Sequence, residues 1–204
     1  MSGDFNLNSM HFSVLQELGN IGAGNAVTSL STLLNRKIDM NVPKVQILSF
    51  DEVSRVIGGP ETPVVAVLVN VNSENVNGLM MFVVEVDNVG VLISSLMGQV
   101  VTSIGEIEQS AMKEVGNILT ASYLSALSVV LDTPIDMSVP YLTMDMAGSV
   151  LSVPAIEFAK VADSTLFIES IFATDENDIS GYFILVPDQK SYNFIFKKLG
   201  LEQE

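Results

Sequence analysis

The chain has 204 residues, of which 24 are acidic and 9 basic, so its formal net charge is −15. This charge repels nucleic-acid backbones and anionic lipid surfaces and argues against both as partners. Because the chain has no cysteine, a disulfide framework, thiol catalysis and a zinc–thiolate site are excluded, and we expect a cytoplasmic protein.

The first half of the chain predicts a long helix, three strands and a closing helix. Apolar residues recur at helical spacing over residues 10–35, and a short helix is expected at Phe50–Ile57. Apolar runs of strand length predict the three strands, which are Ile38–Leu48, Val64–Val71 and Gly78–Val86. The closing helix is expected to begin at Asp87 and to end at Gly98.

The second half predicts the same order of elements. A long helix is expected at about Glu106–Leu131, where Ser103 and Glu106 resemble a capping box. The predicted strands are Ile135–Met144, Thr165–Ala173 and Gly181–Val186. A short helix should follow Asp145, and Asp188 should lead the final helix, which ends at Gly200.

The two halves carry one polar pattern at a constant separation of 97 residues. Its members are Ser13, Glu17, Asn20 and Pro43 in the first half and Ser110, Glu114, Asn117 and Pro140 in the second. We therefore expect one domain over residues 1–204, made of two repeats at about 10–98 and 107–200. Two helix–strand–strand–strand–helix repeats predict a pseudo-twofold α/β fold, with a shared antiparallel-rich sheet and the two long helices packed on it.

On each long helix the polar pattern is expected to lie opposite the apolar face. At about 100° per residue, Ser13, Glu17 and Asn20 share one side of the first helix. The residues expected to face the core are Leu15, Gly22, Ala26 and Leu33 in the first helix and Met112, Leu119, Tyr123 and Val130 in the second. Because core packing does not require the polar face, its repetition predicts a function.

Other interpretations of these residues are weaker. Gly19, Gly22 and Gly24 follow no strand, so close helix packing is a better explanation for them than a dinucleotide-binding loop. Glu17 and Glu114 could form the carboxylate pair of a glycosidase, but each has its own Asn one turn later, so two identical sites fit better. An Asn amide cannot act as a general base, but it can hold a water molecule for attack on a phosphoryl group.

The doubled pattern resembles the signature of the CheC/CheX/FliY phosphatases of bacterial chemotaxis. In that signature Asp or Ser is followed by Glu, then by Asn, and 22 further residues separate the Asn from a Pro, as they do in both halves here. The segment Glu17–Ala26 is most similar to the CheC type. The resemblance implies a phosphatase that hydrolyses the aspartyl phosphate of the response regulator CheY.

The same resemblance implies roles for individual residues. Asn20 and Asn117 would orient the attacking water, and Glu17 and Glu114 would pair with the active-site lysine of the regulator. Supporting roles fall to the remaining members of the pattern, which are Ser13, Pro43, Ser110 and Pro140. The protein would need no cofactor or metal of its own, because the phosphorylated regulator would hold Mg²⁺.

The resemblance also implies CheD as a second partner, with a contact around Asp145. The alternative function is a non-catalytic scaffold that binds CheY or CheD, as related flagellar switch proteins do. The Glu and Asn pair is intact in both halves. A pure scaffold has no chemical reason to keep this pair, so we expect an enzyme.

Overall fold

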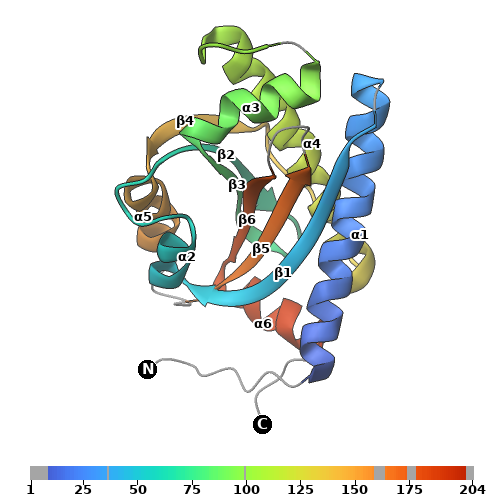
Figure 1. Ribbon diagram of the computed structural model, residues 1–204. Helices are drawn as coiled ribbons and strands as arrows, with labels where there is room; N and C mark the ends of the chain where they lie inside the picture. Colours follow the sequence, from blue (N-terminus) through green and yellow to red (C-terminus); the bar gives the residue numbers. More distant parts are fainter. Residues whose placement is uncertain (1–8, 36, 99, 159–163, 174–177, 201–204) are drawn as a thin grey trace.

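The computed structural model describes residues 9–35, 37–98, 100–158, 164–173 and 178–200, and one antiparallel sheet lies at its centre (Figure 1). The sheet has six strands in the order β1-β5-β6-β3-β2-β4. The strands are β1 (Asp39–Ser49), β2 (Pro63–Asn72), β3 (Asn77–Glu85), β4 (Tyr141–Met146), β5 (Ser164–Ala173) and β6 (Ile179–Pro187).

The two halves of the chain exchange their outer strands. The first strand of the first half, β1, pairs with β5 of the second half, and β4 of the second half pairs with β2 of the first. The two halves meet at the centre, where β3 pairs with β6. The order of the strands is therefore equivalent when read from either edge, and the predicted pseudo-twofold fold is confirmed.

Helices cover both faces of the sheet (Figure 1). The long helices α1 (Ser9–Leu34) and α4 (Glu106–Leu131) lie on one face, together with α3 (Val86–Met97) and α6 (Gln189–Lys198). The short helices α2 (Phe50–Val56) and α5 (Ala147–Phe158) lie on the other face.

The central strands are apolar on both sides because both faces of the sheet are covered. In β2, Val65 and Val67 belong to the core beneath the long helices, whereas Val64 and Ala66 belong to the core beneath α2 and α5. This alternation follows from the period of two residues in a strand. It accounts for the continuous apolar runs of the sequence.

One helix of the described residues, α4, is long and apolar enough to cross a membrane. More than half of its apolar window is buried inside the fold. It packs as a core helix beside α1, on the face of the sheet that both long helices cover.

The predicted strand Ile135–Met144 is wrong in its first half. Regular pairing begins only at Tyr141, and an isolated bridge between Val71 and Met137 precedes it. In the segment between the bridge and Tyr141, the side-chain hydroxyl of Ser138 accepts the backbone N–H of Asn70 at 3.0 Å, in place of a strand carbonyl. Pro140 has no N–H group to add to a ladder, and it separates the bridge from β4.

Two further details of the long helices differ from the prediction. At the start of α4, the carboxylate of Glu108 accepts the backbone N–H of Gly105 at 2.9 Å, so Glu106 is the first helical residue and does not form the expected capping box. Near the end of α1, Leu33 is 55% exposed. The buried row there continues through Leu30 and Leu34, four residues apart.

Candidate functional site

The first polar pair lies on the outer side of α1. Glu17 and Asn20 are both exposed. Leu15, which precedes them, and Leu18, which lies between them in sequence, are buried in the core. Ser13 is exposed one turn before Glu17. The helix therefore displays the pair at the surface, as its apolar period predicts.

The second polar pair has the corresponding position on α4. Glu114 is exposed and Asn117 is half-buried, while Met112 and Val115 are buried. Ser110 is exposed one turn before Glu114. The structure thus places each Glu one turn from its own Asn and keeps the two pairs on separate helices.

Glycines allow the long helices to pack closely, as expected for two of the three glycines of α1. A Cβ atom on Gly19 would lie 2.6 Å from Cγ2 of Val45 in β1, and one on Gly22 would overlap the ring of Tyr123 in α4. Gly24 has no atom within 4 Å of such a Cβ atom, so packing does not explain it. In the second half, a Cβ atom on Gly116 would lie 2.6 Å from Cγ2 of Val67 in β2.

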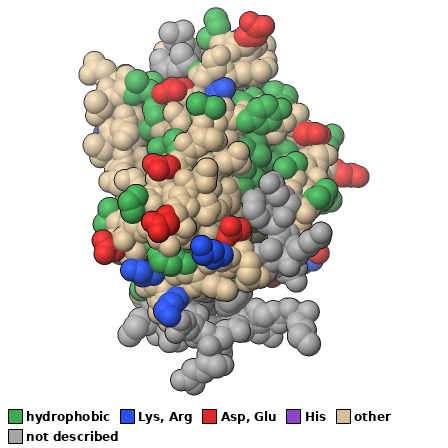
Figure 2. Space-filling view, turned by 180° about the vertical axis from the view of Figure 1, so that it is seen from behind, with side chains coloured by type: hydrophobic (Ala, Val, Ile, Leu, Met, Phe, Trp, Pro, Cys, Tyr) green, Lys and Arg blue, Asp and Glu red, His purple; other side chains and the backbone are tan. Residues whose placement is uncertain are grey.

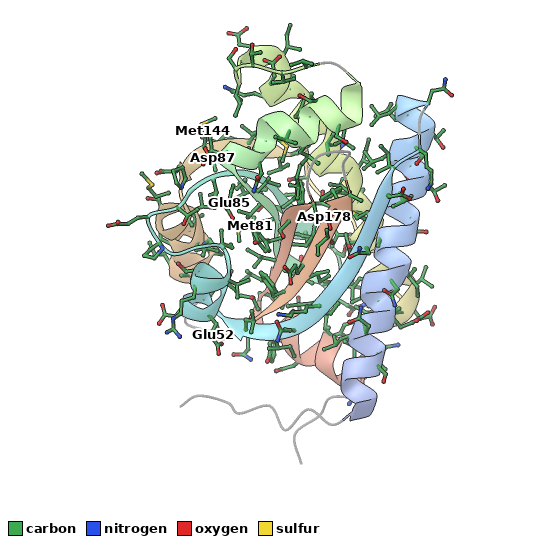
Figure 3. The ribbon with its side chains drawn as sticks, in the orientation of Figure 1. Glu52, Met81, Glu85, Asp87, Met144 and Asp178 are labelled. Carbon is green, nitrogen blue, oxygen red and sulfur yellow. The ribbon has the colours of Figure 1, made fainter. Side chains whose placement is uncertain are left out.

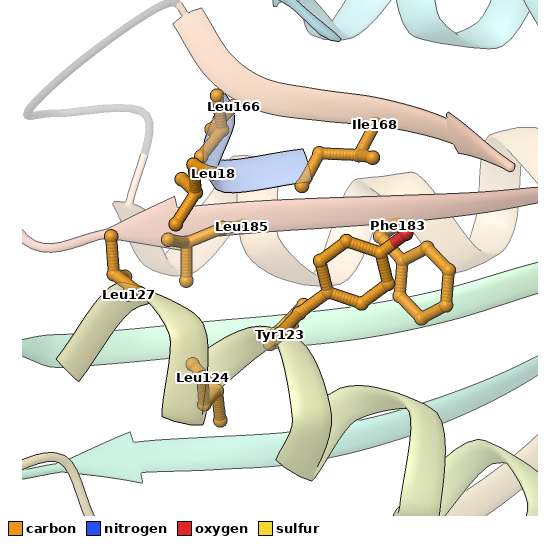
Figure 4. Close-up of a pocket in the computed structure, with 9 residues that line it drawn as sticks. Leu18, Tyr123, Leu124, Leu127, Leu166, Ile168, Phe183 and Leu185 are labelled. Carbon is orange, nitrogen blue, oxygen red and sulfur yellow. The ribbon is translucent and has the colours of Figure 1, made fainter. Parts of the chain in front are cut away.

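Tyr123 anchors α4 on the sheet beneath the sites (Figure 4). Its ring centroid lies 4.3 Å from that of Phe183, and its hydroxyl forms a 2.8 Å hydrogen bond with the hydroxyl of Ser170. Burial raises the pKa of Tyr123 to about 12, and the hydrogen bond with Ser170 acts in the opposite direction.

A small apolar cavity lies beside Tyr123, between the long helices and the sheet (Figure 4). Its volume is about 10 Å³, which is the space of one water molecule. It is lined by Leu18, Met80, Tyr123, Leu124, Leu127, Leu166, Ile168, Phe183 and Leu185. The cavity is too small and too apolar to bind a small-molecule substrate.

The two prolines of the pattern lie at the outer strands, Pro43 inside β1 and Pro140 just before β4. In β1 the pairing with β5 shifts between Asn41 and Lys44, so Val42 and Pro43 form a β-bulge opposite the single residue Ser170. Pro140 stands immediately before β4. A proline is tolerated at these places because an edge strand needs only one side of its backbone for pairing.

One residue near the first pair was not singled out in the sequence. Gln16 precedes Glu17, and its side-chain amide contacts both Asn20 and the β1 backbone at Val42. The sequence does show that the two repeats differ at this position, because Lys113 stands there in the second half, 97 residues later.

Asp145 lies at the opposite outer edge of the sheet, in β4. It is exposed, and its carboxylate accepts the backbone N–H of Met146 at 2.7 Å just before α5 begins. Met144 and Met146 beside it are 45% and 46% exposed. Figure 3 labels Met144 on this strand, and Figure 2 shows hydrophobic side chains gathered on the side where β4 and α5 lie.

Among the described residues, no group of three His, Asp or Glu side chains is placed to hold a metal ion. Each polar pair supplies one carboxylate and one amide. Its own chemistry is therefore limited to hydrogen bonding, positioning and the pairing of a single negative charge with a cation.

Comparisons with known proteins agree with the doubled pattern. The model of the CheC-like family matches residues 10–47 and 107–144, which contain the complete pattern of each half. The chain is 34% identical over 194 residues, 92% of both chains, to a Bacillus subtilis protein named CheY-P phosphatase CheC. It is also 34% identical to the flagellar motor switch phosphatase FliY of the same organism. That match extends over 138 residues, which are 66% of this chain and 35% of FliY.

Solved structures show the same fold. The crystal structure of Thermotoga maritima FliY covers 95% of this chain and 99% of its own, with a TM-score of 0.70 and 26% identity. The FliM middle domain of Vibrio alginolyticus matches with a TM-score of 0.65, covers 91% of this chain and 99% of its own, and is 15% identical. With a relative 34% identical over nearly its whole length, the chain belongs to the CheC-like family.

Proposed function

We propose that this protein is a phosphatase that hydrolyses the aspartyl phosphate of CheY. The observation that carries the proposal is the exposed Glu and Asn pair, present on both long helices of a chain related to a CheY-P phosphatase along almost its whole length. An exposed pair on a convex helix suits a protein substrate, which brings its own phosphoryl group to the site.

In this mechanism the chain contributes positioning rather than a nucleophile. Asn20 or Asn117 holds a water molecule in line with the phosphorus atom. The water oxygen forms a bond to phosphorus, the bond from phosphorus to the aspartate oxygen breaks, and inorganic phosphate and the free carboxylate are released. The loose transition state of phosphoryl transfer depends mainly on such positioning and on charge stabilisation.

Glu17 and Glu114 act in docking in this proposal. A carboxylate repels phosphate oxygens, so its suitable partner is a cation on the regulator, the active-site lysine. Ser13 and Ser110 would support the contact, and Pro43 and Pro140 would shape the outer strands nearby. The regulator would hold the Mg²⁺ ion that neutralises the phosphoryl group, and the reaction would take place in the cytoplasm.

We also propose that CheD binds around Asp145. This carboxylate is exposed between two half-exposed methionines at the edge of the sheet, which is a mixed charged and apolar surface. Asp145→Asn should weaken the binding of CheD in calorimetry and leave the hydrolysis of phosphorylated CheY unchanged. Equal binding by the variant would place the contact elsewhere.

The decisive experiment measures phosphate release from phosphorylated CheY with and without this protein. An enzyme increases the rate constant at substoichiometric concentration, whereas a scaffold binds CheY and leaves the rate constant unchanged. This experiment also tests the alternative of a non-catalytic scaffold, which is relevant because the FliM middle domain has the same fold. Binding without any acceleration would overturn the phosphatase proposal.

A further inference from the structure

The two halves differ at the residue that precedes the Glu of each polar pair. Gln16 stands there in the first half, and Lys113 stands at the equivalent place in the second. Both lie four residues before the Asn of their pair, so each is on the same side of its helix as that Asn. This position can therefore influence the Asn directly.

Gln16 connects the Asn of the first pair to the outer strand. Its Nε2 atom donates to the carbonyl oxygen of Val42 at 2.9 Å and lies 3.5 Å from Oδ1 of Asn20. The first contact has the ideal length of a hydrogen bond, and the second is long. The Gln16 side chain is half-buried and contacts Asn20 as well as Val42, so its position is restricted.

The proline of the pattern makes this carbonyl available. Val42 and Pro43 lie in the bulge of β1, where neither has a partner in the ladder with β5. The missing side chain of Gly19 lets α1 approach the same strand, since a Cβ atom there would lie 3.0 Å from Cγ1 of Val42. The bulge and the close helix together bring the Val42 carbonyl within reach of Gln16.

The second half lacks this connection. Val42 is 8% exposed beneath α1, whereas the equivalent Val139 is 86% exposed, so its segment does not pack under a long helix. The carbonyl oxygen of Val139 accepts instead from the hydroxyl of Ser138 at 3.0 Å. Lys113 is exposed.

We propose that Gln16 is a positioning residue of the first site, which fixes the side-chain amide of Asn20 against β1, and that the second site has no equivalent. The inference rests on the proposed function. An amide oxygen has two lone pairs, so Oδ1 of Asn20 can face Gln16 with one and a water molecule with the other. With its oxygen held in this direction, the amide cannot turn its NH₂ group toward the water.

The test isolates the first site by means of Asn117→Ala. In this background, Gln16→Met removes the donor and keeps the length and volume of the side chain. We expect kcat to fall roughly threefold to tenfold, the value of one hydrogen bond, while KM for phosphorylated CheY stays the same. Gln16→Glu, which has an acceptor where Val42 needs a donor, should lower kcat at least as much.

The matched control isolates the second site by means of Asn20→Ala. There, Lys113→Met removes an exposed cation and should leave kcat unchanged while it alters the salt dependence of KM. An equal loss of kcat from Lys113→Met would overturn the proposed asymmetry.

A second measurement does not depend on catalysis. In NMR spectra, Gln16→Met should shift the side-chain amide signals of Asn20, and Lys113→Met should leave those of Asn117 in place. If wild-type protein accelerates phosphate release while Gln16→Met changes neither kcat nor the Asn20 signals, the positioning role is wrong and the phosphatase stands. If the Asn20 signals shift but no acceleration occurs in the wild type, the phosphatase is wrong.

Discussion

Gly22 of α1 and Tyr123 of α4 are in contact, and a methyl group on Gly22 would overlap the tyrosine ring. The ring in turn packs on Phe183 and its hydroxyl binds Ser170, so one contact joins both long helices to the sheet. The helices that display the two polar pairs are thus fixed relative to each other at this point.

The first prediction concerns that contact. Gly22→Ala should lower the free energy of unfolding by about 1–3 kcal/mol, because overpacking outweighs the better helix propensity of alanine. Gly24→Ala is the matched control, since its new methyl group meets no atom within 4 Å and should stabilise the helix by up to about 1 kcal/mol. Urea unfolding measures both, and equal effects of the two changes would contradict the packing.

The second prediction concerns alkaline pH. Burial raises the pKa of Tyr123 from 10.0 to about 12, and burial raises those of Tyr182 and Tyr192 as well. The folded protein therefore holds these protons more tightly than the unfolded chain. Its stability should be complete below about pH 10 and should decrease as the pH rises toward 12.

For Tyr123 alone the loss at pH 12 should reach roughly 2 kcal/mol. Urea unfolding at several pH values, with the tyrosinate absorbance followed in parallel, measures it. Tyr123→Phe is less stable near neutral pH because Ser170 loses its partner, but its stability should fall less between pH 10 and 12. A parallel fall in both proteins would show that Tyr123 is not the group that titrates.

The third prediction concerns the side-chain amides of Asn20 and Asn117. Asn20→Ala and Asn117→Ala should each lower turnover at their own site about 100-fold or more, and the double variant should lose nearly all phosphatase activity. Stability should change little, because Asn20 is exposed, Asn117 is half-buried and neither belongs to the core. A folded double variant with near wild-type turnover would remove the basis of the assignment.

The fourth prediction concerns the carboxylates. Replacing both Glu17 and Glu114 with Gln should raise KM for phosphorylated CheY about threefold to tenfold at low salt and weaken its salt dependence. The shape of the pH–rate profile should stay the same, because the proposed role is an ion pair with the partner. A variant that binds normally but has a displaced profile would indicate general-base catalysis instead.

Local sequence signals predicted the elements of this fold well. The period of the apolar residues placed α4 at its observed bounds, and the duplication implied the pseudo-twofold sheet. The exchange of β1 and β4 between the halves could not be predicted, since it depends on pairing between residues far apart in the chain.

Within the candidate site, the exposed positions of Glu17 and Asn20 followed from helical spacing. The contact from Gln16 to Val42 did not, because it requires the bulge that Pro43 occupies and the close approach that Gly19 permits. The late start of β4 was missed for a similar reason, since the hydroxyl of Ser138 replaces a backbone partner.

The exchanged outer strands also determine when the protein can fold. About 115 residues separate the end of β1 from the start of β5, which is its neighbour in the described part of the sheet. During synthesis, β1 therefore leaves the ribosome long before a partner for its backbone exists. Such distant pairing slows folding and leaves the backbone edge of this strand open to wrong partners in the meantime. We expect the first half to stay unfolded until the second is nearly complete, so that the helices carrying the two polar pairs are fixed in one late step.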